Sequence, residues 1–275
     1  MSPLLLTARL DVVESVRARW FLVYALIFGG IIAGFFAFGV TESRVLGFIG
    51  LSRLLVTYIQ LAMAIMPVFI LITTVRSLAG DRESGVFEYL LSLPVSLGAW
   101  FWGKLAGRYV VVFAPVFLAM LGAALWALAQ GIDVPWGMFA YYSALLAAMS
   151  WCFLGLGMLI SAVARSTDVA QGAAFMVWLA LLLLLDLILL GVLIQGRVAA
   201  ELVVAIALIN PLQVFRTAAL MLFDPQLVVF GPAAYVIYDY FGGSLFMVYG
   251  CVYPVLVGTL AAVAGFLLFR RRDVT

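Results

Sequence analysis

The chain has 275 residues, of which 67% are hydrophobic and 10% are charged. Soluble globular domains carry about 25% charged residues, so this composition excludes a soluble protein and indicates an integral membrane protein. The net charge of +2 comes without a basic, aromatic-interleaved patch, and no nucleic-acid partner is expected.

Enzyme chemistry has little support in this sequence. Histidine is absent, which removes the commonest metal ligand and the commonest general acid or base at neutral pH. The sequence has no nucleotide-binding loop, zinc-protease motif or nucleophile elbow. We therefore expect neither an enzyme nor a cofactor on this chain.

The apolar runs predict an all-α membrane protein with a single transmembrane domain over residues 1–275. Residues 3–19 interleave apolar and charged side chains, which is typical of an amphipathic elbow helix in the membrane interface. Six spans are predicted, at residues 20–40, 54–78, 105–130, 136–164, 169–194 and 245–269. Pro67 is expected to kink the second span.

The segment 195–244 has shorter apolar runs, interrupted by Asn210-Pro211 and Asp224-Pro225. As a helix, its run 198–209 would rise only about 18 Å, too little for the ~30 Å hydrocarbon core. Irregular backbone at membrane depth is tolerated only where protein covers it. We expect short outer or re-entrant helices here, between spans five and six.

Arginine and lysine are distributed unevenly between the two ends of the predicted spans. With a cytoplasmic N-terminus, eleven of the 15 basic residues lie inside, namely Arg9, Arg17, Arg19, Arg76, Arg82, Lys104, Arg108, Arg165, Arg270, Arg271 and Arg272. The remaining four, Arg44, Arg53, Arg197 and Arg216, lie outside. The positive-inside rule thus predicts that both termini are cytoplasmic and that segment 195–244 is extracytoplasmic.

A charged stretch from Arg76 to Lys104 lies between two long apolar runs. We expect a short helix at 80–93 in it, which begins at Gly80 or Asp81 and ends before Pro94. Helical periodicity gives this helix a polar face that includes Asp81, Arg82, Ser84 and Glu88. The opposite, apolar face carries Val86, Phe87, Leu90 and Leu91.

Glu83 interrupts that apolar face, where a carboxylate would be costly to desolvate. The structural interpretation places Glu83 in the first turn of its helix, favoured by the helix dipole and a capping box with Gly80. The functional interpretation has the apolar face pack on a soluble partner, which supplies a counter-charge for Glu83 and a groove for Phe87 and Leu90.

Asp186 is the only ionisable residue well inside a predicted span. Charge in the membrane is expensive, so an intramembrane carboxylate indicates a position on a transport path or at a dimer interface. The alternative is a protonated or hydrogen-bonded structural residue. Some sulfur-containing side chains in the apolar runs could act as soft ligands for Cu(I), although such side chains usually fill protein cores. These residues are Met63, Met66, Met149, Met158 and Cys152.

The run DRESGVFEYLLSLPVS from Asp81 to Ser96, followed by Gly103-Lys104, resembles the E-x-G-x-x-E-x-L-L-x-x-P-x-S segment of ABC-2 type permeases. In that family the segment is a coupling helix that docks on a separate cytoplasmic ATPase subunit, where ATP and magnesium bind. The resemblance implies ATPase contacts for Asp81, Arg82, Glu83, Val86, Phe87, Glu88, Leu90 and Leu91. Because six helices rarely enclose a transport path alone and the chain has no nucleotide motif, we expect a homodimer with two ATPase copies, surrounded by lipids in the bacterial inner membrane.

More narrowly, Asn210-Pro211 with Phe215-Arg216 and the terminal run Phe269 to Asp273 are similar to permeases that serve the maturation of nitrous oxide reductase. This resemblance implies an exporter that works with a periplasmic partner and supplies a substrate, such as a sulfur species, for copper-site assembly.

Two other classes of protein stay open. One is an ion-driven secondary transporter, and the other is a membrane scaffold that transmits a conformational change without moving a substrate. Co-purification with an ATPase would argue against the first alternative. Substrate-stimulated ATP hydrolysis would argue against the second.

Overall fold

The computed structural model describes residues 2–17, 23, 27, 47–86, 95–129, 131, 133–184, 187, 200–223 and 232–272. Over these ranges the protein is helical and has no β-strand, as the composition predicts. The predicted first span, 20–40, lies outside them except for residues 23 and 27.

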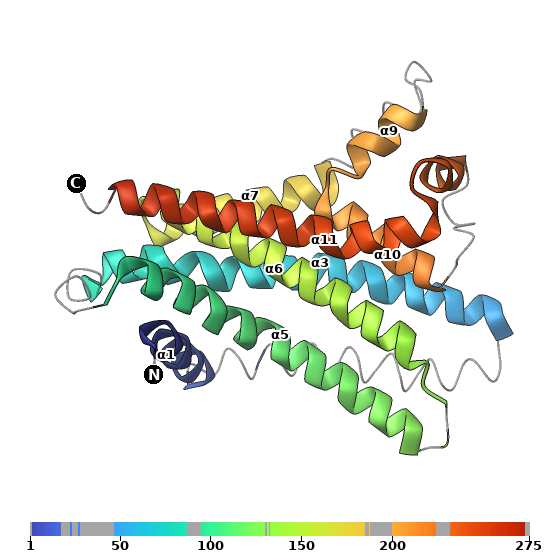
Figure 1. Ribbon diagram of the computed structural model, residues 1–275, viewed down its shortest axis with the longest axis horizontal. Coiled ribbons are helices and arrows are strands. Elements are labelled where there is room, and N and C mark those ends of the chain that lie inside the picture. The colour runs from blue at the N-terminus through green and yellow to red at the C-terminus, as the bar shows by residue number, and fades with distance from the viewer. Residues whose placement is uncertain are drawn as a thin grey trace.

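The helices follow one another as α1 (Pro3–Arg17), α3 (Gly47–Glu83), α5 (Leu97–Ala129), α6 (Trp136–Val163), α7 (Thr167–Leu179), the π-helix η1 (Ala180–Leu184), α9 (Ala200–Ala207), α10 (Pro211–Phe223) and α11 (Pro232–Arg272) (Figure 1). In the described part of the chain, 4 helices are long and apolar enough to cross a membrane, within α3, α5, α6 and α11. The bent pair of α9 and α10 would raise this number to 5 if it counts as one span. The count of six spans stays a prediction.

Helix α6 covers nearly the same residues as the predicted span at 136–164, whereas α5 begins eight residues before the predicted span at 105–130. The membrane limits of both spans stay predictions. Helix α5 begins at Leu97, next to Ser96, whose hydroxyl accepts a hydrogen bond from the amide of Ala99 at 3.3 Å. Lys104 and Arg108 therefore lie inside a long apolar helix. Charged side chains are tolerated there because other helices supply their partners, as described below.

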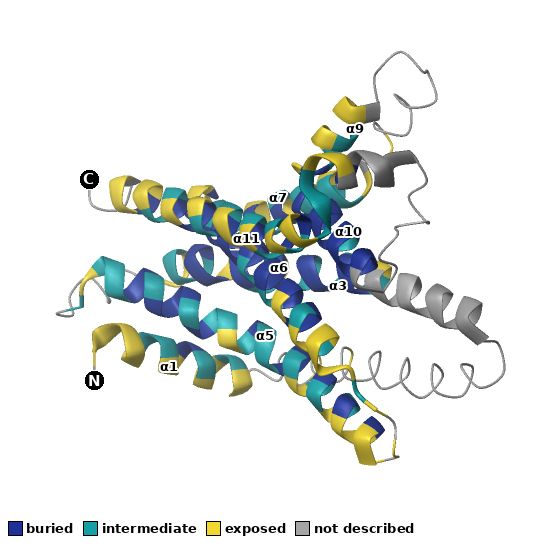
Figure 2. Cartoon of the chain, turned by 45° about the vertical axis from the view of Figure 1, so that its right-hand side comes forward, coloured by how far each residue is buried: buried dark blue, intermediate teal, exposed yellow. Residues whose placement is uncertain are grey.

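Helix α6 lies at the centre of the bundle and packs against α3, α5, α10 and α11. Its closest neighbour is α11, since a Cβ atom on Gly155 would lie 2.0 Å from the carbonyl oxygen of Gly258. Such backbone-to-backbone contact through small residues is a common way for membrane helices to associate. Figure 2 shows the buried residues on the inner sides of the helices and the exposed ones on their outer sides.

Both termini, the end of α3, the start of α5 and the turn between α6 and α7 lie at one end of the bundle, on the left in Figure 1. We call this the charged end. The turn between α5 and α6 lies at the opposite end, flanked by Trp126 and Trp136, which are 67% and 46% exposed. Exposed tryptophans are typical of a membrane–water interface.

The segment between the predicted fifth and sixth spans contains two helices that meet at a bend of 105°. Helix α9 corresponds to the short helix expected at 198–209. Helix α10 was not anticipated as a core element, yet it packs against α3, α6 and α11, and Leu212, Val214 and Ala218 are fully buried. Neighbouring helices of the chain thus cover α10.

Candidate functional site

The predicted helix start at Gly80 or Asp81 is wrong, because these residues form the last turn of α3. The helix stops at Glu83, where the amides of Ser84 and Gly85 donate to the carbonyls of Gly80 and Arg82 at 3.0 and 3.2 Å. Gly85 has a φ of 71°, the left-handed conformation that commonly ends a helix. Asp81, Arg82 and Glu83 therefore extend a membrane helix instead of opening a separate one.

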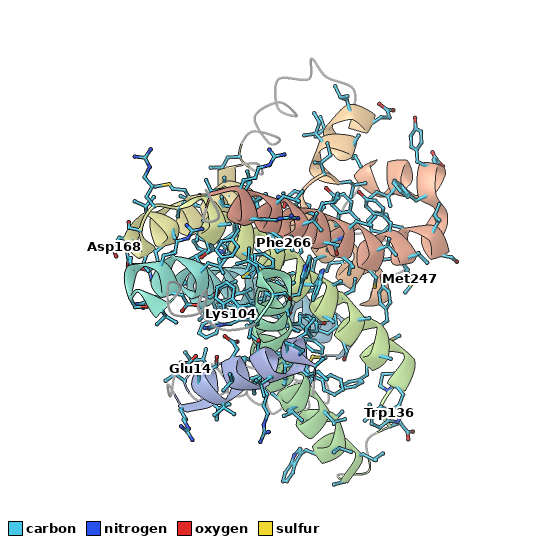
Figure 3. The ribbon with its side chains drawn as sticks, turned by 60° about the vertical axis from the view of Figure 1, so that its left-hand side comes forward. Glu14, Lys104, Trp136, Asp168, Met247 and Phe266 are labelled. Carbon is cyan, nitrogen blue, oxygen red and sulfur yellow. The ribbon has the colours of Figure 1, made fainter. Side chains whose placement is uncertain are left out.

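Lys104 of α5 forms an ion pair with Asp81 of α3. Its ammonium also donates to the carbonyl of Ser77 at 3.0 Å and lies 5.0 Å from the ring centre of Trp100. Only 8% of Lys104 is exposed, and a lysine this buried requires such partners. Figure 3 shows Lys104 among these helices, with Asp168 at the same end of the bundle and Trp136 at the other.

Arg108, one turn further along α5, joins α1 to α3. Its Nε donates to Asp11 at 3.1 Å, and its Nη1 donates to the carbonyl of Thr73 at 3.4 Å. Asp11 is only 4% exposed. Burial raises the pKa of the Asp11 carboxyl above its ordinary value, although the positive charges of Arg108 and Lys104 act in the opposite direction. The buried ion pair thus fixes the amphipathic helix to the bundle.

Two glycines allow α1 to approach α5 this closely. A Cβ atom on Gly103 would lie 2.7 Å from the carbonyl oxygen of Leu4, and one on Gly107 would lie 2.7 Å from that of Ala8. Each glycine directly precedes one of the basic residues that hold the site together. The repeated pattern Gly-Lys-x-x-Gly-Arg is the sequence signal for this contact, and it was not among the predicted site features.

Arg82 binds the carboxyl end of α6. Its two terminal nitrogens donate to the carbonyls of Ala162 and Ala164 at 3.2 and 3.4 Å, and its guanidinium lies 5.3 Å from the ring centre of Phe269 on α11. A cation is stabilised at the carboxyl end of a helix, where carbonyls lack helical partners. Arg82 therefore ties the end of α3 to both α6 and α11.

Glu83 binds the amino end of the next helix. Its carboxylate accepts hydrogen bonds from the amide of Thr167 at 2.9 Å and from the Thr167 hydroxyl at 2.6 Å. Ser166 caps the same helix by accepting from the amide of Val169 at 3.3 Å. The structural interpretation predicted that Glu83 caps the first turn of its own helix. This is wrong, because its carboxylate caps α7. The groups that bind the Glu83 carboxylate, the amide and hydroxyl of Thr167, therefore belong to this chain and not to a partner.

The remaining predicted contact residues are only partly visible. Val86 is 43% exposed, whereas Phe87, Glu88, Leu90 and Leu91 lie outside the described residues, as does Asp186. The sulfur-containing residues considered as copper ligands are all buried in the core, at 5% exposure or less: Met63, Met66, Met149, Met158 and Cys152. In the described ranges no cluster of three acidic or cysteine side chains could hold a metal ion.

Side chains at the charged end thus join six helices: two ion pairs link α1, α3 and α5, and Arg82 and Glu83 add α6, α7 and α11. A family model for ABC-2 family transporter proteins matches residues 5–274. The chain is 28% identical over 228 residues to the probable ABC transporter permease protein NosY of Stutzerimonas stutzeri. The matched region covers 79% of this chain and 81% of that protein. Identity to the NosY protein of Pseudomonas aeruginosa is also 28%, over 223 residues with the same coverage.

Proposed function

The chain belongs to the ABC-2 family of transporters, and from this premise we propose that it is the permease subunit of an exporter whose ATPase docks at the charged end. The charged end then faces the cytoplasm of a bacterial cell, and the protein lies in the inner membrane as a homodimer. ATP and magnesium bind to the partner subunit.

The observation that carries this proposal is the pair of neighbouring side chains at the end of α3. Arg82 holds the carbonyls that end α6, and Glu83 holds the amide that begins α7. The segment that resembles a coupling helix follows directly along the chain. A displacement of that segment by the ATPase would be passed to α6 and α7 through these charge-assisted hydrogen bonds.

Two further links extend this transmission to other helices. Lys104 connects the same turn of α3 to α5, and Arg108 connects α5 to α1. A single movement at the end of α3 would therefore reach every element that meets at the charged end. In this scheme Glu83 is a positioning residue, while Phe87 and Leu90 are the direct contacts with the ATPase.

The substrate is proposed from the similarity to NosY. We assign the exporter to the supply of a substrate, such as a sulfur species, for copper-site assembly of nitrous oxide reductase. A periplasmic partner receives that substrate. Asp186 is assigned to the transport path or the dimer interface, because a lipid-facing charge at this place would be unfavourable.

The test of the docking proposal is co-purification of the permease with its ATPase at matched expression. Phe87→Ala should weaken the complex most, by about 2 kcal/mol or roughly thirtyfold in affinity, as expected for an interface anchor. Glu88→Ala, on the polar face, should have a milder effect. Retention of the ATPase by every variant at the wild-type level would contradict docking at this end.

A double-mutant cycle distinguishes positioning from direct contact at Glu83. Thr167→Val removes the hydroxyl that Glu83 accepts from, so Glu83→Ala and Thr167→Val should each lower ATPase retention. If Glu83 acts through Thr167, the double variant should lose no more ATPase than the single variant with the larger loss. Additive losses would instead show that Glu83 contacts the ATPase itself.

A further inference from the structure

The helix that begins with α7 changes its winding at Ala180–Leu184, where it becomes a π-helix. A π-helix places one more residue in the turn than an α-helix and is found mostly at functional positions. Its backbone hydrogen bonds are set differently from those of the flanking α-helix. The carbonyl of Leu181 lies in this segment and accepts a side-chain hydrogen bond from another part of the chain.

The partner of this segment is the corner where α9 and α10 meet. The carbonyls of Leu208 and Ile209 come at the end of α9, where the helix provides no amides for them. The hydroxyl of Tyr249 donates to Leu208 at 3.0 Å, and that of Tyr253 donates to Ile209. Both tyrosines lie on α11, so the corner is fastened to that helix.

Asn210 is the next residue and is only 1% exposed. Its side-chain oxygen accepts from the amide of Leu212 at 3.0 Å, which makes it the cap of α10, and Pro211 occupies the first helical position. Its side-chain nitrogen donates to the carbonyl of Leu181 at 2.6 Å. A carboxamide is needed because one group of this size must both accept and donate.

We propose that Asn210 is a positioning residue that latches the bent pair α9–α10 to the π-helical segment, so that both move together. Helix α10 is buried among α3, α6 and α11, whereas α9 exposes Leu202 and Ile206. The hydrogen bond to Leu181 is a direct link between the middle of the fifth predicted span and this corner. The latch follows from the geometry alone, and its use in transport rests on the proposed permease function.

Two substitutions separate the latch from the helix cap. Asn210→Ser keeps an oxygen that can cap α10 but is too short to reach Leu181, whereas Asn210→Ala removes both bonds. The measurement is hydrogen–deuterium exchange on the full chain in lipid nanodiscs. Asn210→Ser should speed exchange at least threefold in peptides covering 180–184 and 201–207 and leave 211–223 unchanged. Asn210→Ala should also speed exchange in 211–223.

Two outcomes of this experiment overturn the latch. One is wild-type exchange in 180–184 and 201–207 for Asn210→Ser. The other is faster exchange of Asn210→Ala in 211–223 alone, with 180–184 and 201–207 at the wild-type rate, which would show that Asn210 acts only as a cap. Faster exchange of Asn210→Ser that is confined to 180–184 and 201–207 supports the latch.

A second arm adds the ATPase and compares exchange with and without ATP. In the wild type, ATP should change exchange in 180–184 and 201–207 together, and in Asn210→Ser the change in 201–207 should be lost. Persistence of both changes in Asn210→Ser would overturn the role of the latch in transport. If the variant loosens the corner but ATP has no effect on the wild type, the latch stands and the proposed ATP-coupled permease fails.

Discussion

The charged end and the corner between α9 and α10 solve the same problem with different side chains. In both places helices stop inside a membrane protein and leave backbone groups without helical partners. At the charged end, Arg82 and Glu83 satisfy the ends of α6 and α7 with ionised groups. At the corner, Asn210, Tyr249 and Tyr253 do so with neutral groups.

The difference follows the local exposure of each site. Glu83 is exposed at the surface, so its charge stays solvated, whereas Asn210 is buried and its neutral amide costs less to desolvate. Charges that are buried at the charged end, such as Asp11 and Lys104, have partners of opposite charge. Charged side chains are thus used where water reaches them or where the chain supplies a partner of opposite charge.

The largest contrast expected is an all-or-none labelling result. Cysteines introduced at Ser84 on the charged end and at Asp133 on the opposite end, both exposed, should differ completely in reaction with a membrane-impermeant maleimide on intact cells. Only the cysteine at position 133 should react. The native Cys251, which is half-buried, is replaced by alanine as the background control. Labelling at position 84 from outside would reverse the orientation.

The next largest effect is expected for the partly buried ion pair of Asp81 and Lys104 at the charged end. Lys104→Ala leaves Asp81 without its partner and should lower the free energy of unfolding in detergent by about 3 kcal/mol. The matched control is Lys104→Met with Asp81→Leu, which removes both charges and should be close to neutral. A loss below about 1 kcal/mol in the single variant would mean that the pair behaves as a solvated surface pair.

The smallest effect is expected at the corner, where the bonds are neutral. Tyr249→Phe keeps the ring and removes the hydroxyl that donates to Leu208, so it should cost about 1 kcal/mol of unfolding free energy. Tyr253→Phe should behave alike. Tyr240 is 72% exposed, and Tyr240→Phe serves as the control that should have no effect. Equal effects at Tyr240 and Tyr249 would show that the corner carbonyls do not depend on these bonds.

Composition and apolar runs were sufficient to predict a helical membrane protein with helices near 3–19 and 136–164. The reason is that lipid offers no hydrogen bonds, so a long apolar run has little alternative to a helix. The sequence also predicted a short helix at 198–209, because the length of this run and the Asn210-Pro211 pair rule out a simple span. The resemblance that led to the ABC-2 family came from the local run after Asp81.

Tertiary structure alone decided how the charged and polar side chains are used. Glu83 binds Thr167, which is 84 residues away, and Asn210 binds Leu181, which is 29 residues away. The Gly-Asp pair at 80–81 resembled a helix start, but α3 continues through it. There Asp81 pairs with Lys104, and Arg82 donates to the carbonyl of Ala164. Such pairings depend on which helix faces meet in the bundle, and local periodicity carries no information about the helix on the other side.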